Sequence, residues 1–162
     1  MTPKFTIGKE RIMIGEKYLC NGHWLASRDA ALSPMAPKPL KLLLSVKTGT
    51  YHDGVAAGLS VETTPDFASV IPKRDGYLIL KESPSGVEFR GDSTEIMAYV
   101  YEAGDFKIGV AHRYVPLLGL GRAFAKDSSS PIIVLDGDTL NDNLLAVVMP
   151  MRLNAPKGAT NA

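Results

Sequence analysis

The most informative stretch of this chain is residues 144–153, which read LLAVVMPMRL. It is a run of apolar residues ending in a proline and an arginine. The run is too short to span a membrane and too uniformly apolar for a strand with one solvent-facing side. We therefore predict a closing strand that is buried on both faces. Pro150 cannot donate a hydrogen bond to a strand ladder, so the sheet should end there or Pro150 should lie at its edge.

A rim of adaptable side chains follows this strand. Met149, Pro150 and Met151 lie next to the cation of Arg152 in the sequence. Unbranched thioether side chains adjust to ligands of different shape, which suits a groove that accepts several related peptides. The same residues also fit a plain core strand with a frayed end. The pattern alone leaves both interpretations open.

The composition is typical of a soluble globular protein. Hydrophobic residues make up 45% of the 162 residues and charged residues 22%, enough for one ordinary domain or two small ones. Eighteen basic and seventeen acidic residues give a net charge of +1, so no global field attracts nucleic acid or membrane. The single cysteine, Cys20, excludes an internal disulfide and a cysteine-based zinc site. Without an apolar signal core or a segment of transmembrane length, we expect a cytoplasmic protein with no membrane contact.

Short strands dominate the predicted first part, residues 1–70. Apolar pairs at residues 12–14 and 18–20 predict strands, and Asn21-Gly22 is a strong turn dipeptide. Leucines at helical spacing predict a helix over residues 38–47, after a connection at 27–37 that its prolines keep irregular. An extended linker around residues 63–76 carries two prolines and marks the boundary between two lobes.

The second lobe, residues 71–153, has more regular strand signals. They fall at residues 77–80, 86–89, 95–101, 106–110 and 132–135, ahead of the closing strand. Residues 112–126 predict a second helix, short or bent because it contains Pro116, Gly119 and Gly121. Residues 154–162 are small and polar and predict a disordered tail. The whole pattern predicts an α+β fold with mostly antiparallel sheets, two short helices and two small lobes.

No catalytic, cofactor or metal-binding constellation stands out. The three histidines lack metal-ligand spacing, and residues 119–121 form a bare GxG without the strand-turn-helix context of a phosphate loop. The acidic residues Asp136, Asp138 and Asp142 look like turn formers rather than a paired acid and base. We therefore predict that the chain is not an enzyme, binds no cofactor or metal, and acts by recognition.

The residues of the closing stretch resemble a known family. Residues 146–153 are similar to the terminus of the bacterial DNA polymerase III beta subunit, the sliding clamp, whose chains close on a YxxMPMRL-type run. Other segments follow in clamp order. Residues 21–26 (NGHWLA) are similar to the DGHRLA motif of the clamp's second domain, and residues 65–73 to the PDY..VLPK segment joining domains two and three. Residues 104–115 resemble the strand leading into the last helix of the third domain, and 130–133 the strand after it.

The resemblance implies a hydrophobic pocket that receives the short clamp-binding peptides of polymerases and other replication proteins. Carried over residue by residue, the pocket would use Gly22, His23, Leu25, Pro72, Tyr114, Val147, Met149, Pro150, Met151 and Arg152. Trp24 stands where the family usually has arginine, which would reshape the pocket.

The resemblance also implies contact with double-stranded DNA, without sequence preference. The family's helices line the DNA hole, and the basic residues of the two predicted helices would meet phosphates here: Lys38, Lys41, Lys47, Arg113, Arg122 and Lys126. This chain is much smaller than a clamp. It has no counterpart of the first domain and lacks the first strand and helix of both remaining domains.

The function implied is that of a reduced, DNA-clamp-like replication factor, of the kind a phage or mobile element would carry. In its full version it is a homo-oligomer that forms a processivity ring, and three two-lobed copies would restore the six lobes of a clamp. Two alternatives stay open. One is a pocket-only mimic that acts as a decoy, and the other is a structural or assembly β-protein whose ending resembles a clamp by accident.

Overall fold

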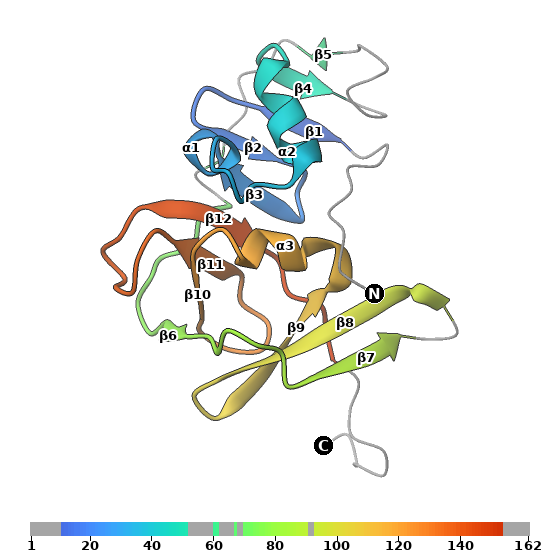
Figure 1. Ribbon diagram of the computed structural model, residues 1–162, viewed down its shortest axis with the longest axis vertical. Helices are drawn as coiled ribbons and strands as arrows, with labels where there is room; N and C mark the ends of the chain where they lie inside the picture. Colours follow the sequence, from blue (N-terminus) through green and yellow to red (C-terminus); the bar gives the residue numbers. More distant parts are fainter. Residues whose placement is uncertain (1–10, 52–59, 62–66, 68–69, 91–92, 154–162) are drawn as a thin grey trace.

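The computed structural model describes residues 11–51, 60–61, 67, 70–90 and 93–153. The described chain consists mainly of strands, interrupted by two stretches of short helices (Figure 1). The elements are β1 (Ile12–Ile14), β2 (Tyr18–Cys20), β3 (Trp24–Ser27), α1 (Arg28–Ala31), α2 (Lys38–Leu42), η1 (Leu43–Ser45), β4 (Gly49–Tyr51), β5 (Ser60–Val61), β6 (Leu78–Ile79), β7 (Gly86–Arg90), β8 (Ser93–Ala103), β9 (Phe106–Ala111), η3 (His112–Tyr114), α3 (Val115–Leu118), β10 (Arg122–Ala125), β11 (Ile132–Leu135) and β12 (Leu144–Val148). In the described part of the chain, no helix has the length and apolar character needed to cross a membrane.

The strands form two sheets. The larger has nine strands in the order β5-β4-β1-β2-β3-β12-β11-β10-β6, and the smaller has three in the order β7-β8-β9. Neighbouring strands pair antiparallel in both sheets. The predicted α+β class with mostly antiparallel sheets is confirmed. Strands of both predicted lobes share the larger sheet, since β3 of the first pairs with β12 of the second.

β12 is the buried closing strand that the sequence predicts. Ala146, Val147 and Val148 are at most 1% exposed, and the strand ends at Val148, ahead of Pro150. Val134 of β11 pairs with Ala146 while the next residue, Leu135, pairs with Leu144. Leu145 is therefore a bulge residue, which strengthens the local twist of the sheet.

The larger sheet has two distinct faces. On one face, directly opposed residues form a row across six strands: Met13, Cys20, Leu25, Val147, Ile133 and Phe124. We call this the linker face, because the linker packs against this cluster with Phe67, Val70, Ile71 and Tyr77. The structure describes the linker at residues 67 and 70–77.

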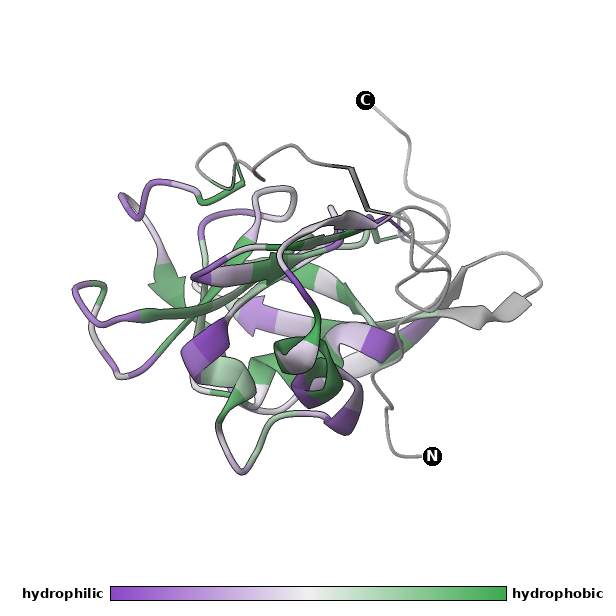
Figure 2. Cartoon of the chain, turned by 90° about the horizontal axis from the view of Figure 1, so that it is seen from above, coloured by the Kyte–Doolittle hydropathy of each residue, from purple (hydrophilic) through white to green (hydrophobic). Residues whose placement is uncertain are grey.

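The opposite face, which we call the helix face, carries the row Ile14, Leu19, Ala26, Ala146, Val134 and Ala123. Apolar side chains of α2 and α3 belong to the same core cluster, among them Leu40 and Leu117. Tyr101 of β8 and Val110 of β9 join this cluster from the smaller sheet. The helices lie on one side of the larger sheet, in front of it in Figure 1 and below it in Figure 2.

The predicted helix over residues 112–126 is wrong in its second half. The chain is helical only to Leu118, and Arg122–Ala125 is the strand β10, paired with β11 and β6. Gly119 ends the helix. At Gly121 a Cβ would overlap the carbonyl oxygen of Leu135, so the chain there already lies against β11. This close approach redirects the following residues into the sheet.

The first half also differs from expectation in its helices. The connection at residues 27–37 contains α1, whose first turn is capped by Ser27: its hydroxyl oxygen accepts a hydrogen bond from the Ala30 N–H at 3.0 Å. The predicted helix over 38–47 is α-helical only to Leu42 and continues as the 3₁₀ turn η1. The predicted tail at 154–162 lies outside the described residues.

Candidate peptide-binding surface

The predicted pocket segments at residues 21–26 and 144–153 lie side by side. Trp24, Leu25 and Ala26 of β3 pair with Val148, Val147 and Ala146 of β12. Beyond the strand, the Met149 N–H donates to the His23 carbonyl oxygen at 2.8 Å. The two segments are therefore hydrogen-bonded neighbours despite their distance in the sequence.

A rigid turn presents His23 at this junction. The Asn21 side-chain oxygen accepts hydrogen bonds from the N–H groups of His23 at 2.8 Å and Trp24 at 2.9 Å. Gly22 has a φ of +94°, a left-handed conformation that glycine adopts without strain. His23 is exposed, whereas Trp24 is only 1% exposed. The turn thus holds the His23 backbone next to Met149.

After Met149 the chain crosses to the smaller sheet. The Met151 N–H donates to the Gly109 carbonyl oxygen of β9 at 2.8 Å. Any side chain at position 109 would collide with the carbonyl oxygen of Met151, so glycine permits this contact. Met149 is 37% exposed, Arg152 is exposed, and Pro150 is half-buried. Residues 149–152 therefore form a crossing between the two sheets with an accessible outer side.

The larger sheet separates some of the predicted pocket residues from others. Leu25 and Val147 face each other on the linker face. Tyr114 and Met151 pack with the core of the helix face instead. Pro72 is half-buried in the linker, and Gly22 is exposed in the turn before β3. The ten predicted residues are thus divided between the two faces of the larger sheet, the turn before β3 and the linker rather than lining one slot.

The linker face is already covered. Leu25 and Cys20 are 0% exposed and Val147 is 1% exposed. Two residues fix the linker over this face by hydrogen bonds. Arg74 Nη1 donates to the carbonyl oxygens of Leu140 and Asp142, both at 2.6 Å, and the Tyr77 hydroxyl donates to the Pro131 carbonyl oxygen at 2.7 Å. Burial raises the pKa of the Cys20 thiol, only partly offset by a hydrogen bond from the Gly22 N–H, so the thiol stays protonated at neutral pH.

The predicted DNA-facing residues fall into two groups. Lys38, Lys41 and Lys47 are exposed on or just after α2 and η1, and Arg113 is exposed on η3 with its guanidinium carbon 5.4 Å from the Tyr114 ring centre. Leu42 of α2 is also exposed, as are Leu32 and Met35 of the connection before it.

The other two predicted DNA-facing residues lie in different surroundings. Arg122 is on strand β10, not on a helix, and it forms ion pairs with Glu82 and, at 3.1 Å, with Asp138. The Lys126 side chain passes close to Gly76 of the linker. Arg122 is thus already paired with carboxylates, and Lys126 lies away from the α2 lysines.

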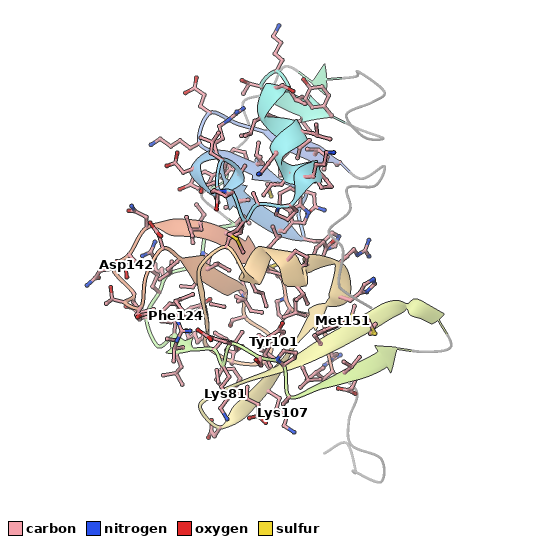
Figure 3. The ribbon with its side chains drawn as sticks, in the orientation of Figure 1. Lys81, Tyr101, Lys107, Phe124, Asp142 and Met151 are labelled. Atoms are coloured by element: carbon pink, nitrogen blue, oxygen red, sulfur yellow. The ribbon has the colours of Figure 1, made fainter. Side chains whose placement is uncertain are left out.

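Two hollows occur elsewhere on the surface. One, of about 340 Å³, has an apolar wall that includes Tyr101 and Leu118 and a charged rim that includes Lys81, and Figure 3 labels Tyr101 and Lys81 near one another. The other, of about 580 Å³, is more polar and includes Arg28 and Asp142. Within the described residues, neither hollow includes any of the ten predicted pocket residues. In that same part of the chain, no three His, Cys, Asp or Glu side chains are grouped so that they could hold a metal ion.

The sequence did not reveal the residues that cover the linker face. The sequence pattern assigns Phe67 and Arg74 to a linker and Tyr77 to a strand, and it predicts no role for them at the junction. One signal could have pointed to Phe67 and Tyr77: aromatic side chains in an extended linker usually find an apolar surface to bury.

Comparisons of this chain with protein-family models, with curated proteins and with solved structures find no match.

Proposed function

We propose that this chain is a sliding-clamp-like DNA replication factor without enzymatic activity, which binds short peptides at the end of the β3–β12 pair. The observation that carries the proposal is the hydrogen bond from Met149 to His23, together with the cross-strand pair of Leu25 and Val147. The two segments that resemble parts of the clamp pocket are neighbours here, and the linker packs beside them. The partners are DNA polymerases or other replication proteins that carry clamp-binding motifs.

Apolar anchoring would supply the affinity. A leucine or phenylalanine of an extended peptide contributes about 1.5–3 kcal/mol when it is fully buried. After the cost of ordering the peptide, binding near the micromolar range, about 8 kcal/mol, is expected. Met149 is the accessible apolar side chain at the junction, and the exposed Arg152 offers a cation to an acidic group of the peptide.

A fluorescence titration tests peptide binding. The wild-type chain should bind a labelled peptide with leucine and phenylalanine anchors at micromolar concentration. Met149→Ala should weaken binding by about tenfold, since the lost apolar contact is worth about 1.4 kcal/mol. Met35→Ala is the matched control, because Met35 is 73% exposed on the α1–α2 connection and should leave affinity unchanged. Absence of saturable wild-type binding at high micromolar peptide would refute the proposal.

DNA contact would involve the exposed cations on the side of the helices: Lys38, Lys41, Lys47 and Arg113. These residues would meet phosphates of double-stranded DNA electrostatically and without reading its sequence. Arg122 and Lys126 do not belong to this surface. Arg122 is paired with the carboxylates of Glu82 and Asp138, and the Lys126 side chain lies near Gly76.

The open edges of the larger sheet support self-assembly into a ring. β6 ends the sheet on one side and β5 on the other. Leu78 and Ile79 of β6 are 47% and 42% exposed, and among the described strands β6 pairs with β10 alone, so this edge offers apolar side chains to a second copy. Sedimentation should then show an oligomer that Ile79→Lys breaks into monomers, and the oligomer should stay on circular but not on linear DNA. A wild-type monomer would rule out the ring.

A second candidate is a structural or assembly β-protein. The complete burial of Leu25 and Val147 favours it, since a covered cross-strand pair can serve the core alone. This candidate predicts no saturable peptide binding by the wild type, by Met149→Ala or by Met35→Ala in the titration above.

A further inference from the structure

The smaller of the two surface hollows lies where the two sheets are joined. After β6, the Leu80 N–H donates to the Ala123 carbonyl oxygen of β10 at 2.8 Å. The next N–H, of Lys81, donates to the Glu102 carbonyl oxygen of β8 at 3.0 Å. The hollow of about 340 Å³ is lined by this connecting segment, β8, α3 and β10. Separate parts of the chain thus form one concave surface, of a size that suits a small molecule.

The wall of the hollow is apolar and belongs to the core of the helix face. Leu80, Tyr101 and Leu118 are buried members of that core, and the half-buried Val115 and Ala123 pack against it. Core packing therefore fixes the shape of the wall. A preformed apolar wall favours a ligand with an apolar body.

The charged residues at the rim are already paired with carboxylates. Lys81 Nζ lies 3.0 Å from the Glu102 carboxylate. Arg122 is paired with Glu82 and also with Asp138, the latter at an ion-pair distance of 3.1 Å but without hydrogen-bond geometry. A charged ligand would have to break one of these pairs or remain uncompensated, whereas an uncharged ligand leaves them intact.

The Tyr101 hydroxyl is the polar group of the wall that remains free. Tyr101 is 4% exposed and lines the hollow, yet within the part of the chain that the structure describes its hydroxyl forms no hydrogen bond. Buried tyrosine hydroxyls usually have a partner, because an unsatisfied one is unfavourable. Burial, with a smaller effect of Tyr99, raises the pKa of Tyr101, so the hydroxyl keeps its proton at neutral pH and can donate.

We infer that this hollow binds a small uncharged molecule, whose apolar body packs against the wall and whose acceptor atom receives a hydrogen bond from the Tyr101 hydroxyl. The inference goes beyond the proposed function and is independent of it, because the described residues that line the hollow include none of the predicted pocket residues. Binding should also raise the melting temperature, since the ligand contacts segments of both sheets in the folded state.

Benzyl alcohol is a suitable probe, because it joins an aromatic ring to one hydroxyl, and benzoate is its charged counterpart. Amide chemical shifts of isotope-labelled protein report where each molecule binds. Benzyl alcohol should shift the amide signals of Leu80 and Ala123 saturably, with a dissociation constant of about 1 mM, as expected for about eight non-hydrogen atoms. Benzoate should bind at least about tenfold more weakly.

A conservative variant tests the hydrogen bond. Tyr101→Phe removes the hydroxyl but keeps the ring, and it should weaken the binding of benzyl alcohol about fivefold. Tyr99→Phe is the matched control and should leave the affinity unchanged. Tyr99 is half-buried on the same strand but is not among the described residues that line the hollow.

Three results would overturn the inference. The first is the absence of saturable shifts at Leu80 and Ala123 at about 20 mM benzyl alcohol, well above the expected dissociation constant. The second is an equal affinity of Tyr101→Phe and Tyr99→Phe, because the Tyr101 hydroxyl would then not hold the ligand. The third is tighter binding of benzoate than of benzyl alcohol, which would exclude an uncharged ligand. Each would leave the proposed peptide binding standing, since the peptide titration measures it separately.

Discussion

Truncation of Val147 should reveal how strongly β12 joins the two halves of the chain. Val147 is 1% exposed and lies between Leu25 of β3 and Ile133 of β11. Val147→Ala removes two methyl groups, a transfer loss of about 1.6 kcal/mol at about 0.8 kcal/mol each. The cavity left between rigid neighbouring strands adds about 1 kcal/mol. We expect the free energy of unfolding to fall by about 2–3 kcal/mol.

Urea denaturation measures this change, and the chain carries a suitable probe. Trp24, the single tryptophan, is 1% exposed and pairs with Val148, so its fluorescence reports the same junction. Circular dichroism should give a coincident transition if the larger sheet unfolds as one unit. Val87→Ala is the matched control, because Val87 is 45% exposed on β7 and should cost less than about 0.5 kcal/mol. A difference between the two variants below about 0.5 kcal/mol would refute the account of β12 as a packed central strand.

Three further predictions concern the linker, an exposed turn and the lysines of α2. Arg74→Ala should lower the free energy of unfolding by about 2 kcal/mol in urea denaturation, because hydrogen bonds from a charged group contribute about 1.5–3 kcal/mol; an unchanged midpoint would mean that the linker is not fixed there. Hydrogen bonds from Ser129 and Ser130 lower the pKa of Asp127 to about 2, below its ordinary value of 3.8. The carboxylate therefore stabilises its turn above pH 4, and the stability advantage of wild type over Asp127→Ala should shrink as the pH falls from 4 towards 2, measured by thermal melts; a gap that stays constant would contradict this. Lys38→Ala and Lys41→Ala should each lower the salt dependence of DNA binding by about one unit of slope in fluorescence anisotropy, whereas Lys126→Ala should not; equal effects of all three would argue against a DNA surface at α2.

Local patterns were enough to predict most strands and the burial of β12. Alternation and turn dipeptides are encoded within a few residues, so the turn at Gly22 and the apolar run before Met149 could be recognised without knowledge of the fold. β10 was missed because its neighbours Gly119 and Gly121 carry no strand signal. Its conformation depends on pairing with β11 and β6, which are distant in the sequence. α1 was missed because a single turn capped by Ser27 is too short to show a helical period.

The candidate site could be predicted only in part. The adjacency of His23 and Met149 was expected from the resemblance alone. The division of the pocket residues between two faces depends on strand register, since neighbouring residues of a strand point to opposite sides. Leu25 and Tyr114 therefore could not be assigned to different faces from the sequence. The packing of Phe67 against Tyr18 depends on where the linker contacts the sheet, and such packing leaves no periodic signal.

The central location of β12 has a consequence for how the protein is made. β12 is the last strand within the described residues, yet it lies between β3 and β11 near the middle of the larger sheet. During synthesis, β1 to β4 can pair at one end and β10 with β11 at the other, but the two parts cannot join before Val148 leaves the ribosome. Until then β3 and β11 each present an unpaired apolar edge to other chains. Nascent chains stalled before residue 144 should therefore associate with chaperones. Nascent chains that extend far enough past Leu153 for β12 to emerge from the exit tunnel should no longer bind chaperones.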